Sequence, residues 1–380
     1  MKLKPDSPAA NQDYPMGDRR VWNFKPSYSF EQHSRECNME GTHFVFWNWT
    51  VAVYLFVAGV SAGAFAISVL AYFIGEEKYE DIARIGAYIA PFPLIFGLLF
   101  LIYDLERPYL FWKLLVTVQI NSVMSLGAWL LLVFSILSFL NFYLWLPERF
   151  DLVEFIRQKF RKREKPAVLC RIRDSRFLES LTRPNLRRFR PLVGLIGMPV
   201  ALFVGIYTGV LLGVLSPRPF WNNPMLPMLF LVSALKTGTA SVCFIGCFVL
   251  GMKGMSREKV ETNKFVIHSV DFFLMILSMI TIILFIFGLY TVSRNSAEAA
   301  KLIMGGEYTF LFWGIAVVVG ILVPFCLEIY ELLPHFVDHS ALREHNPWIS
   351  GVATVAVLVG GYVLRYVIVY AGQATVFISS

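Results

Sequence analysis

Cysteine and histidine are scarce in this chain of 380 residues, which contains five cysteines and six histidines. No two cysteines form a C-x-x-C motif, whereas iron–sulfur clusters require sets of four thiolates. Cys243 and Cys247 share one helix face, a spacing that favours small-residue packing over a metal pair. The sequence therefore predicts neither an iron–sulfur cluster nor a metal site in this chain.

Histidines inside the apolar segments are rarer still. Only His268 lies within a long apolar run, and His43 borders another. These two histidines are expected near opposite membrane surfaces, so they cannot face each other across a haem. We therefore predict no haem, and any redox chemistry must use a visiting molecule or a partner protein.

Charge is also sparse, at 16% of residues against about 25% in soluble domains. Hydrophobic residues make up 56% of the chain, and the mean hydropathy is +0.59. A helix that spans a bilayer needs about 20 apolar residues. The sequence predicts an all-α polytopic membrane protein with eight transmembrane helices. They lie near residues 47–74, 83–103, 123–146, 192–215, 225–250, 266–290, 309–332 and 349–371.

Basic residues are distributed unevenly between the two sets of connections. The connections after the odd-numbered spans hold 20 Lys and Arg, and those after the even-numbered spans hold five. The positive-inside rule therefore places residues 147–191 in the cytoplasm and both termini outside it, in a multi-pass protein of the cell's inner (cytoplasmic) membrane. The polar N-terminal tail, residues 1–46, contains no recognisable cleavable targeting signal.

The 147–191 loop has fourteen basic and six acidic residues. One interpretation is a determinant of topology with an interfacial helix. The other is a binding surface for a cytoplasmic partner or anionic lipid headgroups. Nucleic-acid binding is not needed to explain this charge.

Several spans contain signals of close packing or bending. Gly59–Gly63 and Gly205–Gly209 are small-xxx-small elements that let helices approach closely. Prolines that interrupt spans are expected to produce kinks whose freed carbonyl groups need other partners. These prolines are Pro91, Pro93, Pro199, Pro227 and Pro324.

Ionisable residues inside lipid are costly, on the order of 2.5–3.5 kcal/mol each on insertion scales. Arg365 lies within the last apolar run, and Lys236 lies near the middle of the fifth. A buried arginine favours a carboxylate partner, and Asp104 at the end of the second run is the candidate. We therefore expect polar chemistry inside the helix assembly.

Five segments of the sequence resemble the NrfD/PsrC family of polysulfide-reductase membrane subunits. They occur in the family's order, and the resemblance covers nearly everything between residues 47 and 373. These segments are Trp47–Ala64, Asp104–Pro108, Tyr207–Leu212, Pro219–Pro227 and Gly360–Gln373. The long polar tail and the basic loop depart from the family's pattern.

The resemblance implies two four-helix bundles, residues 47–215 (with the basic loop) and residues 216–380. It also implies a subunit that binds menaquinone or ubiquinone and has no prosthetic group. The usual partner in this family is an iron–sulfur protein with several cubane clusters, which links the quinone to a catalytic or cytochrome subunit.

Quinone chemistry couples two electrons to two protons, so its pocket needs hydrogen-bond partners for both carbonyl oxygens. Polar residues on the predicted extracytoplasmic side are the candidates. They are His43, Asn48, Tyr54, Asp104, Arg107, Tyr207 and Arg365. Asp104 and Arg107 could instead form a local pair at a helix end, and Trp47, Trp49 and Trp221 are expected in the interfacial aromatic belt.

A second polar set lies toward the cytoplasm. His268 and Asp271 share one helix face, Glu328 and Glu331 share another, and Lys236 lies between the surfaces. Such residues can form a proton path, as in membrane pumps. The alternative is two interfacial charge clusters with one Lys–Glu bridge.

Three functions remain open. The first is a quinone-binding redox subunit of a respiratory oxidoreductase complex, with or without proton translocation. The second is a secondary transporter whose midplane charges form a substrate site. The third is a passive membrane anchor for a redox complex.

Overall fold

Eight helices in the computed structural model are long and apolar enough to cross a membrane, which confirms the predicted spans. The structure describes residues 47–75, 78–104, 109, 111–116, 119, 122–146, 187–214, 218–249, 257–338 and 347–375. No strand occurs among these residues. The polar tail and nearly all of the basic loop lie outside them.

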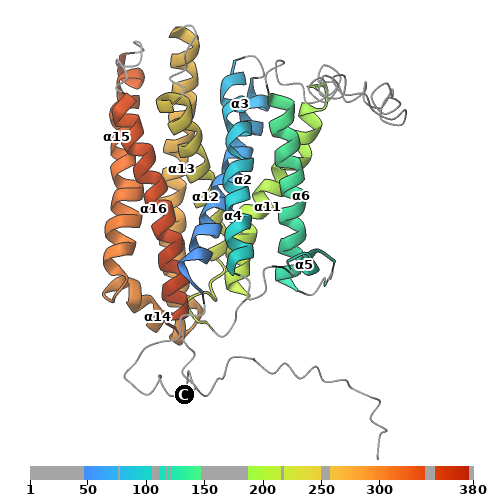
Figure 1. The fold of residues 1–380 in the computed structure, drawn as a ribbon. Helices are drawn as coiled ribbons and strands as arrows, with labels where there is room; N and C mark the ends of the chain where they lie inside the picture. The colour runs from blue at the N-terminus through green and yellow to red at the C-terminus, as the bar shows by residue number, and fades with distance from the viewer. Residues whose placement is uncertain are drawn as a thin grey trace, which may run out of the picture. The chain divides into compact units, whose positions relative to one another are not determined.

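The elements follow the predicted spans closely, and some spans consist of two helical pieces (Figure 1). In order along the sequence they are α2 (Trp49–Ile74), α3 (Glu80–Ile89), α4 (Pro91–Asp104), α5 (Lys113–Val116), α6 (Val123–Trp145), α11 (Arg190–Gly213), α12 (Leu226–Cys243), the π-helix η3 (Phe244–Val249), α13 (Arg257–Val292), α14 (Arg294–Met304), the π-helix η4 (Phe310–Leu322), α15 (Val323–Asp338) and α16 (Pro347–Gln373).

The first and last spans meet at one end of the helix assembly. The backbone N–H of Trp47 donates to Gln373 Oε1 at 2.6 Å, and Gln373 Nε2 donates to the Trp47 carbonyl at 3.2 Å. We call this the termini end; α14 lies there and α3 begins at the opposite end (Figure 1). Which end faces the cytoplasm stays a prediction, and so does the division into two four-helix bundles.

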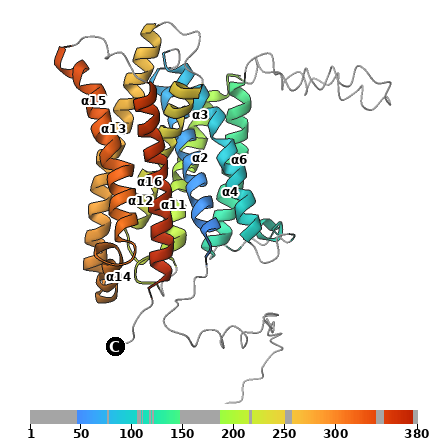
Figure 2. The same ribbon diagram turned by 60° about the vertical axis from the view of Figure 1, so that its left-hand side comes forward.

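Helix α2 is central, because it packs against α3, α4, α11, α12 and α16 (Figure 2). In its most apolar stretch 78% of the residues are buried, compared with 28% for α6. Glycines allow this proximity: a Cβ on Gly63 would lie 2.9 Å from the carbonyl carbon of Ala234 in α12. The Gly59–Gly63 element therefore provides the close packing that its spacing predicts.

Prolines affect the spans differently. Pro91 starts α4, and at the break before it the Ala90 carbonyl accepts a hydrogen bond from the Ser61 hydroxyl. Pro199 lies inside an α11 that continues past it. The expectation that Pro227 interrupts a span was wrong, because it lies in the first turn of α12, where the missing N–H is not needed.

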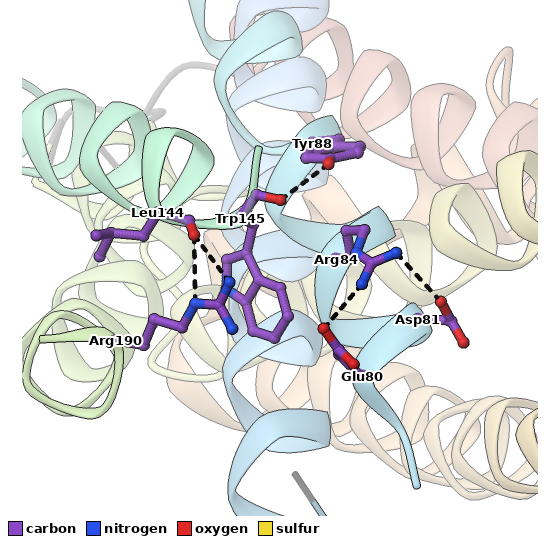
Figure 3. Close-up of polar contacts among 7 residues, drawn as sticks. All are labelled: Glu80, Asp81, Arg84, Tyr88, Leu144, Trp145 and Arg190. Atoms are coloured by element: carbon purple, nitrogen blue, oxygen red, sulfur yellow. Dashed lines mark hydrogen bonds and ion pairs between the residues drawn. The ribbon is translucent and has the colours of Figure 1, made fainter. Parts of the chain in front are cut away.

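The end opposite the termini is held together by polar contacts between three helices (Figure 3). Arg190 donates to the Leu144 carbonyl from Nε at 3.2 Å and from Nη2 at 2.9 Å, and its guanidinium lies 4.0 Å from the Trp145 ring. Tyr88 donates to the Trp145 carbonyl at 2.9 Å. Arg190 and Tyr88 therefore satisfy two C-terminal carbonyls of α6, those of Leu144 and Trp145.

Trp221 corrects one sequence-based expectation. Its side chain is only 3% exposed, its Nε1 donates to the Ile368 carbonyl at 2.8 Å, and its ring stacks on Trp47 at 5.3 Å. It closes the termini end of the core and does not belong to an interfacial belt. Trp49, which is 53% exposed, fits the expected belt position.

Candidate functional site

Arg365 is the most deeply buried cation among the described residues, at 1% exposed. It stands eight residues before the end of α16 at Gln373, or roughly 12 Å along the helix axis at 1.5 Å per residue. The apolar stretch of α16 extends well beyond it in both directions. The guanidinium therefore lies within the hydrophobic part of the protein.

Three helices form the surroundings of this guanidinium. Nη1 donates to Ser233 Oγ of α12 at 2.9 Å and to the Gly361 carbonyl of its own helix at 3.1 Å. The rings of Phe56 from α2 and Phe230 from α12 lie 5.7 and 5.4 Å from it. Apolar rings thus flank the charge on both neighbouring helices, and each can interact with a cation through its face.

Gly59 of α2 makes room for this arginine. A Cβ at this position would lie 2.5 Å from Nη2 of Arg365. Any larger residue would require the guanidinium to move. The Gly59–Gly63 element therefore has two functions: Gly63 brings α2 close to α12, and Gly59 accommodates the arginine.

Two nitrogen atoms of Arg365, Nε and Nη2, form no hydrogen bond within the part of the protein that the structure describes. The hydrogen bonds and ring contacts of Arg365 in that part of the protein include no carboxylate. The expected partner, Asp104, is the last residue of α4, and its side chain is not described. An arginine keeps its charge at any physiological pH, so these donors suit a strong acceptor such as a carbonyl or an anion.

Three of the other predicted quinone-binding residues have described positions. Asn48 is exposed at the start of α2, where its side chain makes no capping bond, and Tyr54 is buried in the same helix. Tyr207 is half-buried, and its ring packs against Gly127 of α6. His43 and Arg107 lie outside the described residues. That these residues share a cavity with Arg365 stays a prediction.

The second polar set forms a connected group. His268 of α13 places Nδ1 2.9 Å from Glu328 Oε2, and its Nε2 lies 3.5 Å from Glu331 Oε2. Both carboxylates come from α15, so the structure joins the two helix faces that were predicted separately. The Nδ1 contact has hydrogen-bond geometry, whereas the Nε2 contact is a longer charge interaction.

Lys236 and Asp271 extend this group toward Arg365. Lys236 Nζ donates to the Gly320 carbonyl at 3.2 Å and attracts Asp271 electrostatically. Pro324 has no N–H to donate to the carbonyl four residues earlier, which is that of Gly320. The lysine thus binds a carbonyl that the proline cannot serve, and no Lys–Glu bridge occurs among the described residues.

The described residues of this group carry more negative than positive charge. Lys236 and Arg365 supply two positive charges, against three carboxylates at Asp271, Glu328 and Glu331. Burying net charge is costly, so the group is most stable when it holds one further proton. His268 and Asp271, whose Oδ1 forms no hydrogen bond with described residues, are suited to hold it.

Sequence reasoning missed Ser233, Phe56 and Phe230 as neighbours of Arg365. Ser233 precedes Lys236 by three residues, so both lie on one face of α12, and that spacing could have identified it. Phe56 and Phe230 give no comparable signal. Apolar rings are abundant throughout these spans, and only the packing selects these two.

The sequence is similar to a known protein family and to individual members of reductase complexes. The family described as "Polysulphide reductase, NrfD" matches residues 38–377. The C polypeptide of the polysulfide reductase of Wolinella succinogenes is 33% identical over 346 residues, covering 89% of this protein and 98% of that polypeptide.

Two further relatives agree with this match. Protein NrfD of Escherichia coli is 30% identical and covers 87% of this protein and 96% of its own length. The C polypeptide of the selenate reductase of Mesobacillus selenatarsenatis is 26% identical, covering 86% of this protein and 74% of that polypeptide. The family match, the eight spans and the relatives along nearly the whole sequence show that this protein belongs to the NrfD polysulphide reductase family.

Proposed function

We propose that this protein is the quinone-binding membrane subunit of a respiratory reductase complex. It exchanges electrons between menaquinone or ubiquinone and an iron–sulfur partner subunit, which connects to further catalytic or cytochrome subunits. The observation that carries the proposal is the buried Arg365 with two unsatisfied donors. Relatives named as parts of polysulfide and selenate reductases support membership in such a complex.

The surroundings of Arg365 suit a quinone ring chemically. The unsatisfied nitrogens can donate to a carbonyl oxygen, and this interaction strengthens as negative charge develops on that oxygen. Phe56 and Phe230 supply apolar faces beside the donors. Arginine does not release its proton, so Arg365 orients and stabilises the substrate while the protons come from other groups.

The experiment for this proposal uses the assembled complex. Arg365→Met should abolish quinone turnover, and Arg365→Lys should impair it, because lysine keeps the charge but loses the planar set of donors. Arg294→Met is the matched control, because Arg294 is an exposed arginine at the termini end. Normal turnover in both Arg365 variants would refute the site.

The same measurement separates the other two functions. A secondary transporter would move a solute without quinone turnover, and a passive anchor would assemble normally without needing Arg365. Quinone-dependent electron transfer that fails specifically in the Arg365 variants excludes both. Transport of a solute by vesicles that lack the partner subunits would favour the transporter.

We further propose that the group of His268, Asp271, Lys236, Glu328 and the half-buried Glu331 conducts protons between the quinone and the end opposite the termini. Its charge balance, which calls for one additional proton, supports this role. A proton that crosses the membrane field works against about 2.3 kcal/mol per 100 mV. Quinone turnover would then be coupled to charge movement.

The test of the proton path is proton translocation by proteoliposomes during quinone turnover. Lys236→Met and Glu328→Gln should slow turnover or uncouple it from proton movement without preventing assembly. Glu298→Gln, an exposed acidic residue of α14, is the control. Unchanged turnover and proton yield in both buried variants would assign these residues a structural role.

A further inference from the structure

Three tyrosines continue the membrane-facing stripe of α16. Residues at intervals of three and four are exposed in the first half of this helix, namely Trp348, Val352, Val355 and Val359. The same spacing continues to Tyr362, Tyr366 and Tyr370, which are half-buried. One helix face thus changes from aliphatic to phenolic as it approaches the termini end. We call these three residues the tyrosine ladder.

The rings of the tyrosine ladder follow one another along the helix. Tyr366 and Tyr370 stack with centroids 4.3 Å apart and an interplanar angle of 27°. Tyr362 and Tyr366 are 6.4 Å apart and tilted by 41°. Such arrangements are favourable for aromatic pairs, and the three half-buried side chains remain partly exposed.

The hydroxyls of the ladder make no hydrogen bond with the residues that the structure describes. Tyr362 stands eleven residues before Gln373, or roughly 16 Å along the helix axis. A polar group at that depth is costly unless it finds a partner, and phenylalanine would fill the same space without this cost. The hydroxyl of Tyr362 therefore indicates a partner that carries hydrogen-bonding groups at that depth.

Phe56 connects the ladder to the candidate site. Its ring meets Tyr362 edge-on at 5.8 Å, and the Arg365 guanidinium lies 5.7 Å from the same ring. Tyr362 and Arg365 belong to α16, and Phe56 comes from α2. One half-buried ring at the seam of two helices thus lies between the membrane-facing ladder and the buried cation.

We propose that the tyrosine ladder is the lateral entrance through which a quinone ring passes from the bilayer to Arg365, and that Phe56 is its gate. The inference rests on the proposed function. A quinone has a planar ring that stacks on phenols and two carbonyl oxygens that accept from their hydroxyls, and its tail remains in lipid. Movement of Phe56 opens the ring's way to the unsatisfied donors of Arg365.

A second membrane subunit could also cover this face of α16. The quinone is favoured because the ladder is continuous with Arg365 through Phe56, and a packing interface would not require that connection. The two occupants predict different results. A covering subunit would shield the ladder from a lipid-borne probe, whereas an entrance must stay open to it.

The first experiment is photolabelling of the assembled complex in proteoliposomes with an azidoquinone. We expect the label on α16 between residues 362 and 370, and we expect Tyr366→Leu to reduce it several-fold. Tyr290→Leu is the matched control, because Tyr290 is an exposed tyrosine near the termini end of another span. Label confined to other helices, or a ladder protected by another subunit, would overturn the inference.

The second experiment is steady-state kinetics of the same variants. Loss of one stacking and hydrogen-bonding contact in Tyr366→Leu should raise the KM for quinone several-fold, up to about tenfold, with kcat largely retained. Tyr366→Phe should lie between Tyr366→Leu and the unmodified protein, and the bulkier Phe56→Trp should slow quinone entry.

Failure of the entrance can be distinguished from failure of the proposed function. A complex that turns over quinone normally, with unchanged KM in the ladder variants, refutes the entrance alone. A complex with no quinone turnover and no azidoquinone label refutes both.

Discussion

At the scale of single residues, the position of the Arg365 guanidinium depends on Gly59 of α2, which has no side chain. The Gly59 position lies against Nη2, so Gly59→Ala should displace the guanidinium and lower quinone turnover, while assembly is retained. Gly213→Ala is a control, because a Cβ there meets only an ordinary contact at 3.6 Å. Turnover assays of purified complexes test this. Equal activity in the two variants would show that Arg365 tolerates displacement.

The sequence predicted the buried charges well but their partners poorly. Arg365, Lys236 and His268 stand out because charge within an apolar run is costly wherever the helix packs. Partners depend on rotation and tilt of helices that are distant in sequence, which the periodicity of one sequence does not fix. Lys236 illustrates this: its acceptor is the backbone carbonyl of Gly320.

At the scale of the helices, α2 and α12 pack closely against each other through Gly63 and Gly238. A Cβ on Gly238 would overlap the backbone of Gly63, which has no flexible end that could move away. Gly238→Ala should therefore destabilise the protein by about 1–3 kcal/mol, the usual cost of overpacking. Thermal unfolding of the purified complex measures this, with Gly213→Ala again as reference. A stability loss no larger than in that reference would argue against tight contact.

The number of helices and their limits were predictable, because the length and polarity of an apolar run reflect the bilayer directly. The breaks within the spans were less predictable. Pro91 and Pro227 look alike in the sequence, but one starts a new helical piece within a span and the other lies in the first turn of α12. The difference arises from the turn at residues 219–225, whose structure the sequence did not reveal.

At the scale of the whole molecule, the distribution of basic residues predicts the orientation. In a variant whose native cysteines are replaced, a cysteine introduced at Lys165 should resist an impermeant thiol reagent in intact cells, because the 147–191 loop is predicted to be cytoplasmic. A cysteine at the exposed Glu298 of α14 should react. The reverse pattern would invert the orientation and move the proposed quinone site to the cytoplasmic face.

The pairing of Trp47 with Gln373 has a consequence for how the protein is made. The first span to leave the ribosome makes its closing contact with the last, and α2 also packs on α12 and α16, which are synthesised much later. During synthesis, the faces of α2 that pack on α12 and α16 therefore stay uncovered until those later helices have been inserted. The insertion of α16 therefore completes the packing around α2, and a polypeptide interrupted before α16 would expose the α2 surface that α16 covers.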